Sequence, residues 1–470
     1  MRDLRIPTAT VCAIVFLTPS LTASAGDQLF DMEPICDPGT LAIEVLTDWH
    51  IVDGPVATRQ KLVTINVGEF WPGQDYRVPV RMVVPVDRKA KGFHLTGGHG
   101  PGPLQRDARP NPFETALLKH GVGMVNTVVQ EPGSYGQGRL GGTSGSRFAR
   151  TLNPHDKIQY WAWPATLMRA ITTAYAETEH FEQGRVAVTG SSKNGASPSM
   201  AILHDERMTA VHASVSPIWD SPLRLCDAAT RKLHEAAGGK QRGFSGGHFG
   251  PNFNQAALDA GHTWEELQKF TANISDGVFI SRNLPALKRR GVEMLFHPGT
   301  HDLVAYDLAW GGSHHPDIPI YLGANTGHGK EGHPQLERDQ RNRDAFLLRH
   351  FFPENVEPLL TAPVVEHKVA AGTLKVTVRF PADSGEDRGR IFWMDDRAPD
   401  GSPDYLRQLI PDENTAEMIH DAQRGVWTAD IRIDANVSRV DFFSNHRKRI
   451  RFEGETFNTY LSSPYTRVEL

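Results

Sequence analysis

The chain is poor in cysteine, with three among 470 residues. Cys12 falls in an N-terminal segment with the features of a signal peptide, so Cys36 and Cys226 would remain after its removal. The two lack the spacing of a zinc site. An oxidising compartment would permit a disulfide between them, and two separate buried thiols are the equal alternative.

Long hydrophobic runs are also missing. No stretch of about 18 apolar residues follows the N-terminus, and the first apolar run, residues 11–17, is too short to span a bilayer. Arg2 and Arg5 precede this run, and the small-x-small motif Ala23-Ser24-Ala25 follows it. That order is typical of a signal peptide. We therefore expect residues 1–25 to be removed and the protein to be exported, either periplasmic or secreted, with no membrane span.

A strong excess of charge is absent too. The formal net charge is −5, and no basic stripe is present, which argues against nucleic acid as a partner. The sequence shows no internal repeat and no low-complexity tract. With 39% hydrophobic and 22% charged residues it has a globular composition, and its length suits a large catalytic domain joined to a smaller one.

Short apolar runs alternate with helical stretches over most of the chain, which predicts an α/β fold with a parallel sheet covered on both faces. We expect strands at residues 76–85, 91–98, 123–129, 185–190, 209–216, 291–296 and 318–323, and helices at 113–119, 160–179, 195–204 and 335–352. Residues 27–75 are rich in turns and predict an extension on the domain edge. Residues 217–290 interrupt the strands and predict a lid insertion.

The pattern changes near residue 353. Residues 364–380, 389–393, 425–433 and 437–443 alternate as strands do, with turn residues between them. They predict a small all-β, sandwich-like domain at 356–470, after a catalytic domain at 26–355. Its aromatic residues are compatible with contact to a carbohydrate, although aromatic side chains are equally common in sandwich cores; they are Trp393, Tyr405, Trp427, Tyr460 and Tyr465.

The sharpest motif joins a buried strand to a helix of small residues. Residues 186–190 (VAVTG) lead into Ser191-Ser192-Lys193-Asn194-Gly195. A strand that ends in Gly-x-Ser and continues at once as a helix has the context of a nucleophile elbow, with Ser192 as the nucleophile. The N–H of Lys193 would then face the developing oxyanion. Asn194 stands where the common Gly-x-Ser-x-Gly motif has its last glycine, and Ser191 lies one residue early.

A serine nucleophile needs a base and an orienting carboxylate, which in this fold follow in the order serine, acid, histidine. Asp302 follows the strand expected at 291–296 and is the candidate acid, with Asp307 in reserve. His328 follows the strand expected at 318–323 and is the candidate base. We expect no metal, because His301, His314, His315 and His333 lack a firm ligand spacing.

The second oxyanion donor in this fold comes from the loop after an early strand. Thr96-Gly97-Gly98-His99-Gly100 occupies that place, so Gly98 and His99 are the candidates. A plain glycine turn is the alternative.

The segment Gly190-Ser191-Ser192-Lys193-Asn194-Gly195 resembles the elbow of the PhoPQ-activated pathogenicity-related proteins, which are exported α/β-hydrolases. Further pieces agree in order, namely Thr96-Gly97-Gly98, Tyr160-Trp161-Ala162-Trp163-Pro164, the Asp302/Asp307 loop and Asn325 ahead of His328. The elbow also resembles the Gly-Cys-Ser-Arg-x-Gly motif of glucuronoyl esterases, with Ser191 and Lys193 as departures. Either resemblance implies Ser192 as nucleophile and His328 as base. In the second family the acid can come from another strand.

The sequence thus predicts an α/β-hydrolase with a Ser-His-Asp triad, acting on a small-molecule or polymer ester without a cofactor. A secreted peptidase or amidase uses the same groups and is the first alternative. A non-catalytic exported binding protein on the same fold is the second.

Overall fold

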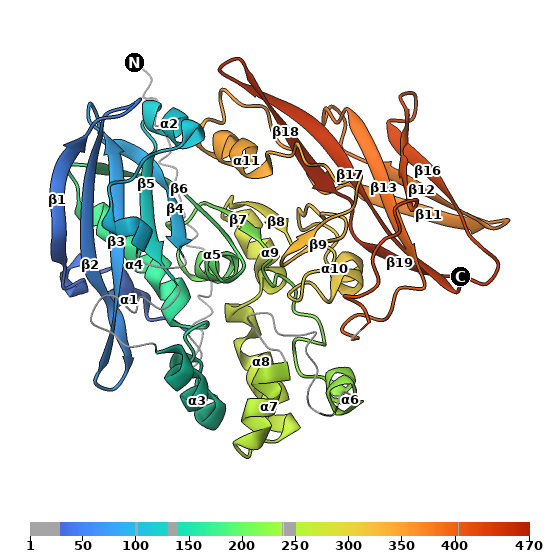
Figure 1. Ribbon diagram of the computed structural model, residues 1–470, viewed down its shortest axis with the longest axis horizontal. Coiled ribbons are helices and arrows are strands. Elements are labelled where there is room, and N and C mark those ends of the chain that lie inside the picture. The colour runs from blue at the N-terminus through green and yellow to red at the C-terminus, as the bar shows by residue number, and fades with distance from the viewer. Residues whose placement is uncertain (1–28, 99–101, 130–139, 237, 239–250, 403) are drawn as a thin grey trace, which may run out of the picture.

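The computed structural model describes residues 29–98, 102–129, 140–236, 238, 251–402 and 404–470. The signal peptide expected at 1–25 and His99 lie outside the described residues. An α/β body and a C-terminal β-sandwich lie side by side (Figure 1). In the described part of the chain, no helix is long and apolar enough to cross a membrane.

The α/β body is built on an eight-stranded sheet in the order β1-β2-β3-β5-β4-β6-β7-β8. The strands β1 to β3 and β5 pair antiparallel, whereas β5, β4, β6, β7 and β8 pair parallel. This arrangement, with a swapped pair β5-β4 beside the central strand, is that of an α/β-hydrolase. The bounds are β1 Glu44–Val52, β2 Thr58–Trp71, β3 Gln74–Pro85, β4 Ala90–Gly98, β5 Gly123–Val128, β6 Phe181–Ser191, β7 Ala210–Ser214 and β8 Glu293–His297.

Helices cover both faces of the sheet. Val186 and Val188 of β6 belong to the core that α4 (Ala162–Ala176), α5 (Lys193–His204) and α9 (Ile280–Arg289) complete. Ala187, between them, packs in a second core with Phe346 of α11 (Asn342–Phe351), and α2 (Pro112–Lys119) covers β3 and β5. Because strand side chains alternate between faces, Thr189 and Ser191 continue on the α11 side.

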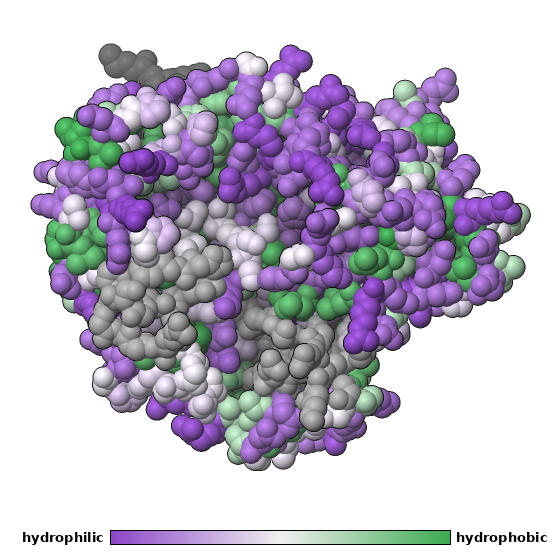
Figure 2. Space-filling view, in the orientation of Figure 1, coloured by the Kyte–Doolittle hydropathy of each residue, from purple (hydrophilic) through white to green (hydrophobic). Residues whose placement is uncertain are grey.

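The N-terminal region departs from the expectation of a turn-rich extension. After the short helix α1 (Met32–Cys36), residues 44–71 form β1 and β2, and β2 buries Val63, Ile65 and Val67 on one face. β1 is the edge strand, and its apolar residues Val45 and Ile51 are exposed. Figure 2 shows hydrophobic groups, in green, at the left of the molecule, where β1 lies in Figure 1.

The strand expected at 318–323 is also wrong. Ile320 makes one isolated bridge with Phe296. Its carbonyl accepts from the N–H of Ser462, and the N–H of Leu322 donates to the Ser462 hydroxyl. On its other side the segment bonds to β8, where the N–H of Phe296 donates to the carbonyl of Pro319 and the carbonyl of Phe296 accepts from the N–H of Tyr321. It therefore borders the sheet through a single bridge and does not form a regular strand. The helix expected at 335–352 begins only at Asn342.

Four helices project beyond the carboxyl ends of the parallel strands (Figure 1). They are α3 (Gly141–Thr151), α6 (Ala228–Ala236), α7 (Pro251–Asp259) and α8 (Trp264–Ile274). The lid insertion expected at 217–290 therefore consists of two parts. α6 to α8 project from the body, whereas α9 packs against α5.

The C-terminal body is a sandwich of two antiparallel sheets. One has the order β11-β12-β16-β15, and the other has the order β14-β13-β17-β18 with β19 on β17. The bounds are β11 Val364–Ala370, β12 Thr373–Arg379, β13 Arg388–Asp395, β14 Thr415–Glu417, β15 Ile419–Asp421, β16 Val426–Arg432, β17 Arg439–Phe452, β18 Glu455–Ser462 and β19 Thr466–Glu469. Leu374, Val376, Ile391 and Phe442 share one core between the sheets.

The aromatic residues suggested for carbohydrate contact lie inside this body. Tyr405, Trp427, Tyr460 and Tyr465 are buried, and Trp393 is half-buried. The four buried rings present no face to a polymer, so a binding surface built from them is wrong.

Both remaining cysteines are free thiols, Cys36 on the surface and Cys226 in the interior. The disulfide alternative is therefore wrong, and so is the burial expected for Cys36.

The close approach of the two bodies yields a prediction. A Cβ at Gly312, in α10 (Leu308–His314), would lie 2.0 Å from the backbone oxygen of Tyr465 in the sandwich. We expect Gly312→Ala to lower the free energy of unfolding by about 1–3 kcal/mol through overpacking, measured by urea denaturation.

Gly145→Ala is the matched control, because nothing lies within 4 Å of a Cβ there and the residue is inside α3. It should raise the free energy of unfolding by up to about 1 kcal/mol. Equal urea midpoints for Gly312→Ala and the wild type would contradict the close contact between Gly312 and Tyr465.

Candidate active site

Ser192 occupies a strained turn between β6 and α5. Its φ is 60° and its ψ is −123°, a conformation that non-glycine residues seldom adopt. Three backbone bonds hold it: its N–H donates to the carbonyl of Ser214 at 2.9 Å, and its carbonyl accepts from Gly195 at 2.9 Å and Ala196 at 2.8 Å. The surroundings thus impose a turn of the kind that raises a serine hydroxyl above the sheet.

Small residues are required on both sides of this turn. A Cβ at Gly190 would lie 1.8 Å from the carbonyl oxygen of Asn194, and one at Gly195 would lie 2.5 Å from the carbonyl oxygen of Ser214. The crowded position after the serine is therefore Gly195. This explains why the chain carries Asn194 where the common motif has glycine.

His328 and Asp302 complete a line of hydrogen bonds that starts at Ser192. The Nε2 of His328 lies 2.8 Å from the Oγ of Ser192, and its Nδ1 lies 2.5 Å from the Oδ2 of Asp302. A carboxylate only accepts hydrogen bonds, which assigns the proton to Nδ1 and leaves Nε2 to accept from the serine. The His328 side chain is 38% exposed, so the line opens to solvent at its serine end.

Asp302 is fully buried, and its Oδ1 accepts from the N–H of Val304 at 2.8 Å. Burial raises the pKa of this carboxyl, an effect that the N–H of Val304 and the ring of His328 oppose. The ionised carboxylate therefore depends on its partners inside the protein.

Backbone and hydroxyl bonds tie the loop that carries Asp302 to the loop that carries His328. The hydroxyl of Thr300 donates to the carbonyl of Gly323 at 3.0 Å and accepts from the N–H of Asn325 at 2.8 Å. The N–H of His301 donates to the carbonyl of Thr326 at 2.8 Å. A Cβ at Gly327 would lie 2.3 Å from the His301 carbonyl oxygen, so the two loops meet backbone to backbone beside His328.

A loop of the sandwich supports both of these loops. The guanidinium of Arg397 is fully buried, donates to the carbonyl of Thr300 at 2.6 Å and to the hydroxyl of Tyr465 at 2.7 Å, and lies 3.7 Å from the ring centre of Tyr405. Asn325 exchanges two bonds with the backbone of Ile410, at 2.9 and 2.8 Å. The sequence analysis missed Arg397, since nothing near it in the chain marks it.

Asp307, the reserve acid, meets a different partner. Its carboxylate accepts from the guanidinium of Arg224 at 2.7 and 2.9 Å and from the hydroxyl of Ser221 at 2.6 Å. Asp307 and Arg224 are both fully buried. This ion pair ties the start of the 217–290 segment to the acid loop.

The oxyanion candidates come together at the same end of the sheet. Lys193 is the first residue of α5, where backbone N–H groups lack acceptors within the helix. β4 pairs with β6 as far as Thr96 and Thr189 and continues to Gly98, while the third candidate, His99, lies outside the described residues. A Cβ at Gly97 would lie 3.4 Å from the Oδ1 of Asn194, which shows how closely the two chain turns approach.

The remaining histidines of interest have other contacts. His301 and His333 reach sandwich carbonyls, at Gln408 and Pro411. His314 bonds to the carbonyl of Trp310, and His315 lies near Asp220. Among the described residues, no group of three or more His, Cys, Asp or Glu is arranged to hold a metal ion.

No family model and no curated protein sequence matches the chain. Similar solved structures include an acetyl xylan esterase from a Paenibacillus species, with 17% identity over 64% of this chain and 87% of that chain and a TM-score of 0.37. An acetyl xylan esterase from a Thermoanaerobacterium species has 14% identity over 61% and 83%, with a TM-score of 0.35. A glucuronoyl esterase from Teredinibacter turnerae has 16% identity over 55% and 61%, with a TM-score of 0.33. At these values we assign neither family nor substrate from them, and the PhoPQ-activated resemblance stays a prediction.

Proposed function

We propose that the protein is a carboxylic-ester hydrolase that works through an acyl-enzyme on Ser192. The observation that carries the proposal is the continuous line from the Ser192 hydroxyl through His328 to the buried Asp302, with the serine held in an elbow turn. A nucleophile, a base and an orienting carboxylate in this geometry serve acyl transfer.

In the first half-reaction the Oγ of Ser192 attacks the acyl carbon while the Nε2 of His328 takes its proton. Asp302 keeps the imidazole in the required tautomer and stabilises the imidazolium. The carbonyl oxygen becomes an oxyanion, which the N–H of Lys193 and an N–H at Gly98 or His99 would stabilise. His328 then passes its proton to the departing alkoxide, and an alcohol leaves.

In the second half-reaction a water molecule gives a proton to His328 and attacks the acyl carbon. Collapse of the second oxyanion releases the carboxylic acid, and His328 returns the proton to Ser192. Every proton moves through one ring, so no cofactor enters the cycle.

Export belongs to the same proposal. The N-terminal segment 1–25 would direct the chain to the periplasm or outside, where a small or polymer ester is the substrate. Cleavage of an amide bond would use the same three residues. Rates measured on a panel of ester and peptide substrates decide between an esterase and a peptidase.

Labelling with a fluorophosphonate tests the nucleophile. We expect the mature wild type to label and Ser192→Ala not to label, because only an activated serine attacks the phosphorus. Ser191→Ala is the matched control and should label as the wild type does. An unlabelled wild type, or equal labelling of Ser192→Ala, would make the proposal wrong and favour a binding protein or another serine.

The two buried aspartates should respond in opposite ways. Asp302→Asn is expected to lower kcat by about 10³–10⁴-fold, since the amide favours the wrong tautomer of His328. It should not lower the free energy of unfolding at neutral pH, because burial raises the pKa of Asp302 and the ionised form therefore disfavours the folded state.

Asp307→Asn is the comparison. It leaves the Arg224 guanidinium buried without its charge partner and should cost about 3–5 kcal/mol of stability, while the folded fraction keeps its kcat. Urea denaturation and active-site titration measure both quantities. Loss of kcat in Asp307→Asn alone would identify Asp307 as the acid.

Arg397 acts on the site through Thr300, so it is a positioning residue. We expect Arg397→Lys to lower kcat of the folded protein by about 10–100-fold with KM nearly unchanged, because the acid loop shifts relative to the elbow. Arg447→Lys, which changes an arginine paired with Asp387 elsewhere in the sandwich, should leave kcat unaltered. A loss of stability in Arg397→Lys without a change in kcat would show a structural role only.

A further inference from the structure

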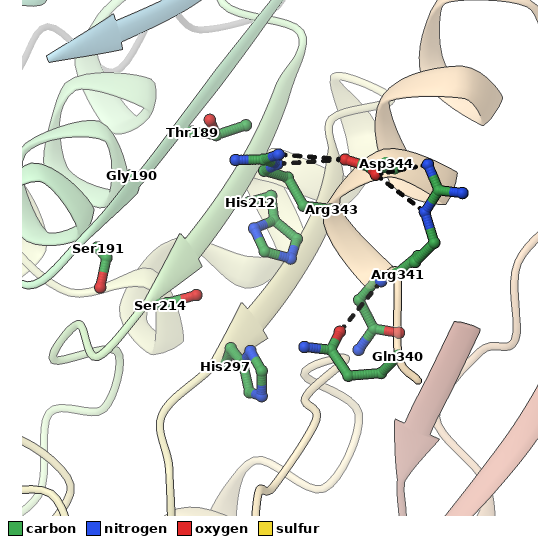
Figure 3. Close-up of a pocket in the computed structure, with 11 residues that line it drawn as sticks. Thr189, Gly190, Ser191, His212, Ser214, His297, Gln340, Arg341, Arg343 and Asp344 are labelled. Carbon is green, nitrogen blue, oxygen red and sulfur yellow. Dashed lines mark hydrogen bonds and ion pairs between the residues drawn. The ribbon is translucent and has the colours of Figure 1, made fainter. Parts of the chain in front are cut away.

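A cavity of about 370 Å³ lies behind the nucleophile turn, on the α11 face of the sheet. Figure 3 shows the ends of β6, β7 and β8 forming one wall and residues 340–344, at the start of α11, forming the other. Neither Ser192 nor His328 lines it. It is therefore separate from the line of hydrogen bonds proposed for catalysis.

Strand alternation explains why this cavity is polar. Ser191 lies on the same face of β6 as Ala187, and on β7 His212 and Ser214 lie on the same face as Ala210. Ala187 and Ala210 pack in the core that includes α11, and the polar residues that follow them on the same face lie opposite residues 340–344, at the start of that helix. The hydroxyls and imidazoles of the strand ends therefore face the cavity.

One buried atom in the wall lacks a partner. The His212 side chain is 5% exposed, and its Nε2 has no hydrogen-bond partner within the part of the chain that the structure describes. Burial lowers the pKa of His212 to about 3 and that of His297, beside it, to about 4. Both rings are therefore neutral at neutral pH and suited to bonding hydroxyl groups.

The opposite wall carries two guanidinium groups and one carboxylate, those of Arg341, Arg343 and Asp344. Arg341 pairs with Asp344 and Glu455. Arg343 contacts Asp344 through Nε at 3.4 Å and Nη2 at 3.2 Å, and its side chain is 55% exposed. In Figure 3 its guanidinium extends from α11 toward Thr189 and His212. Because both arginines share one carboxylate of the lining, the cavity keeps a net positive charge, which favours a ligand with one negative charge.

We propose that this cavity binds a small hydroxy acid, with its carboxylate on Arg343 and its hydroxyls on His212, Ser191 and Ser214. The volume admits a ligand the size of a sugar acid, and the groups in the walls match one charge and several hydroxyls. Binding requires none of the groups that the proposed catalysis uses.

Calorimetry on the full-length mature protein tests the proposal with three probes at constant ionic strength. Sodium gluconate carries both kinds of group, glucose carries hydroxyls without charge, and sodium acetate carries charge without hydroxyls. We expect gluconate to bind at least about tenfold more tightly than either, since a charge-assisted hydrogen bond is worth about that much. Equal binding of glucose or acetate would overturn the proposal, as would no binding of gluconate.

Arg343→Gln should weaken gluconate binding by about tenfold or more, whereas Arg338→Gln, an exposed arginine outside the cavity, should not change it. Nitrogen NMR of the wild type provides a measurement that no substitution disturbs: gluconate should shift the Nε2 signal of His212. Unchanged binding in Arg343→Gln or an unshifted signal would place the ligand elsewhere. Repeating the titration with Ser192→Ala separates the two proposals, because that variant should still bind gluconate whether or not Ser192 is a nucleophile.

Discussion

The buried guanidinium of Arg397 is the interaction on which the rest of the site depends. Burying a permanent charge is costly unless its N–H groups are paired. Arg397 meets that requirement with acceptors from both bodies, the Thr300 carbonyl on one side and the Tyr465 hydroxyl on the other. These bonds join the two bodies, so the sandwich contributes to the position of the loop that carries Asp302.

Contacts between the two bodies also cover the edge of the eight-stranded sheet at its β8 end. After β8 the chain offers another apolar segment, which bonds to Phe296 of β8 on one side and to Ser462 and Asn445 of the sandwich on the other. A free sheet edge invites pairing with other chains, and a covered edge does not. The sandwich covers the outer side of residues 320–322, next to β8. The loop that carries His328 continues directly from this segment. The C-terminal body thus helps to position the loops that carry Asp302 and His328.

Sequence reasoning predicted the features that local chemistry determines. The elbow is visible because Gly190 and Gly195 must be small where backbones touch, and the order of Asp302 and His328 follows from strand ends. Their roles stay predictions, as does that of His99. Spacing could not separate Asp302 from Asp307, which follow the same strand. Their different partners, His328 and Arg224, are brought to them by distant parts of the chain.

The incorrect predictions share one cause: contacts with residues far away in the chain determine the structure of these segments. Residues 318–323 have a strand's composition but form only one bridge with β8, and their remaining backbone bonds include those to Ser462 of the sandwich. Residues 44–71 contain turn-forming residues, yet β2 pairs along its length with β3. Arg397 has the residue type of a surface position and is buried between partners 97 positions before it, at Thr300, and 68 positions after it, at Tyr465.

The end of β6 shows how one strand can serve two purposes. Ser191 is the last residue in register, so its side chain keeps to the α11 face, whereas Ser192 leaves the strand at a positive φ and turns toward His328. Consecutive hydroxyls therefore point to separate spaces. The side chain of Ser191 faces the cavity opposite residues 340–344, at the start of α11. The strain that raises Ser192 and the polar wall behind it both follow from the place where the strand ends.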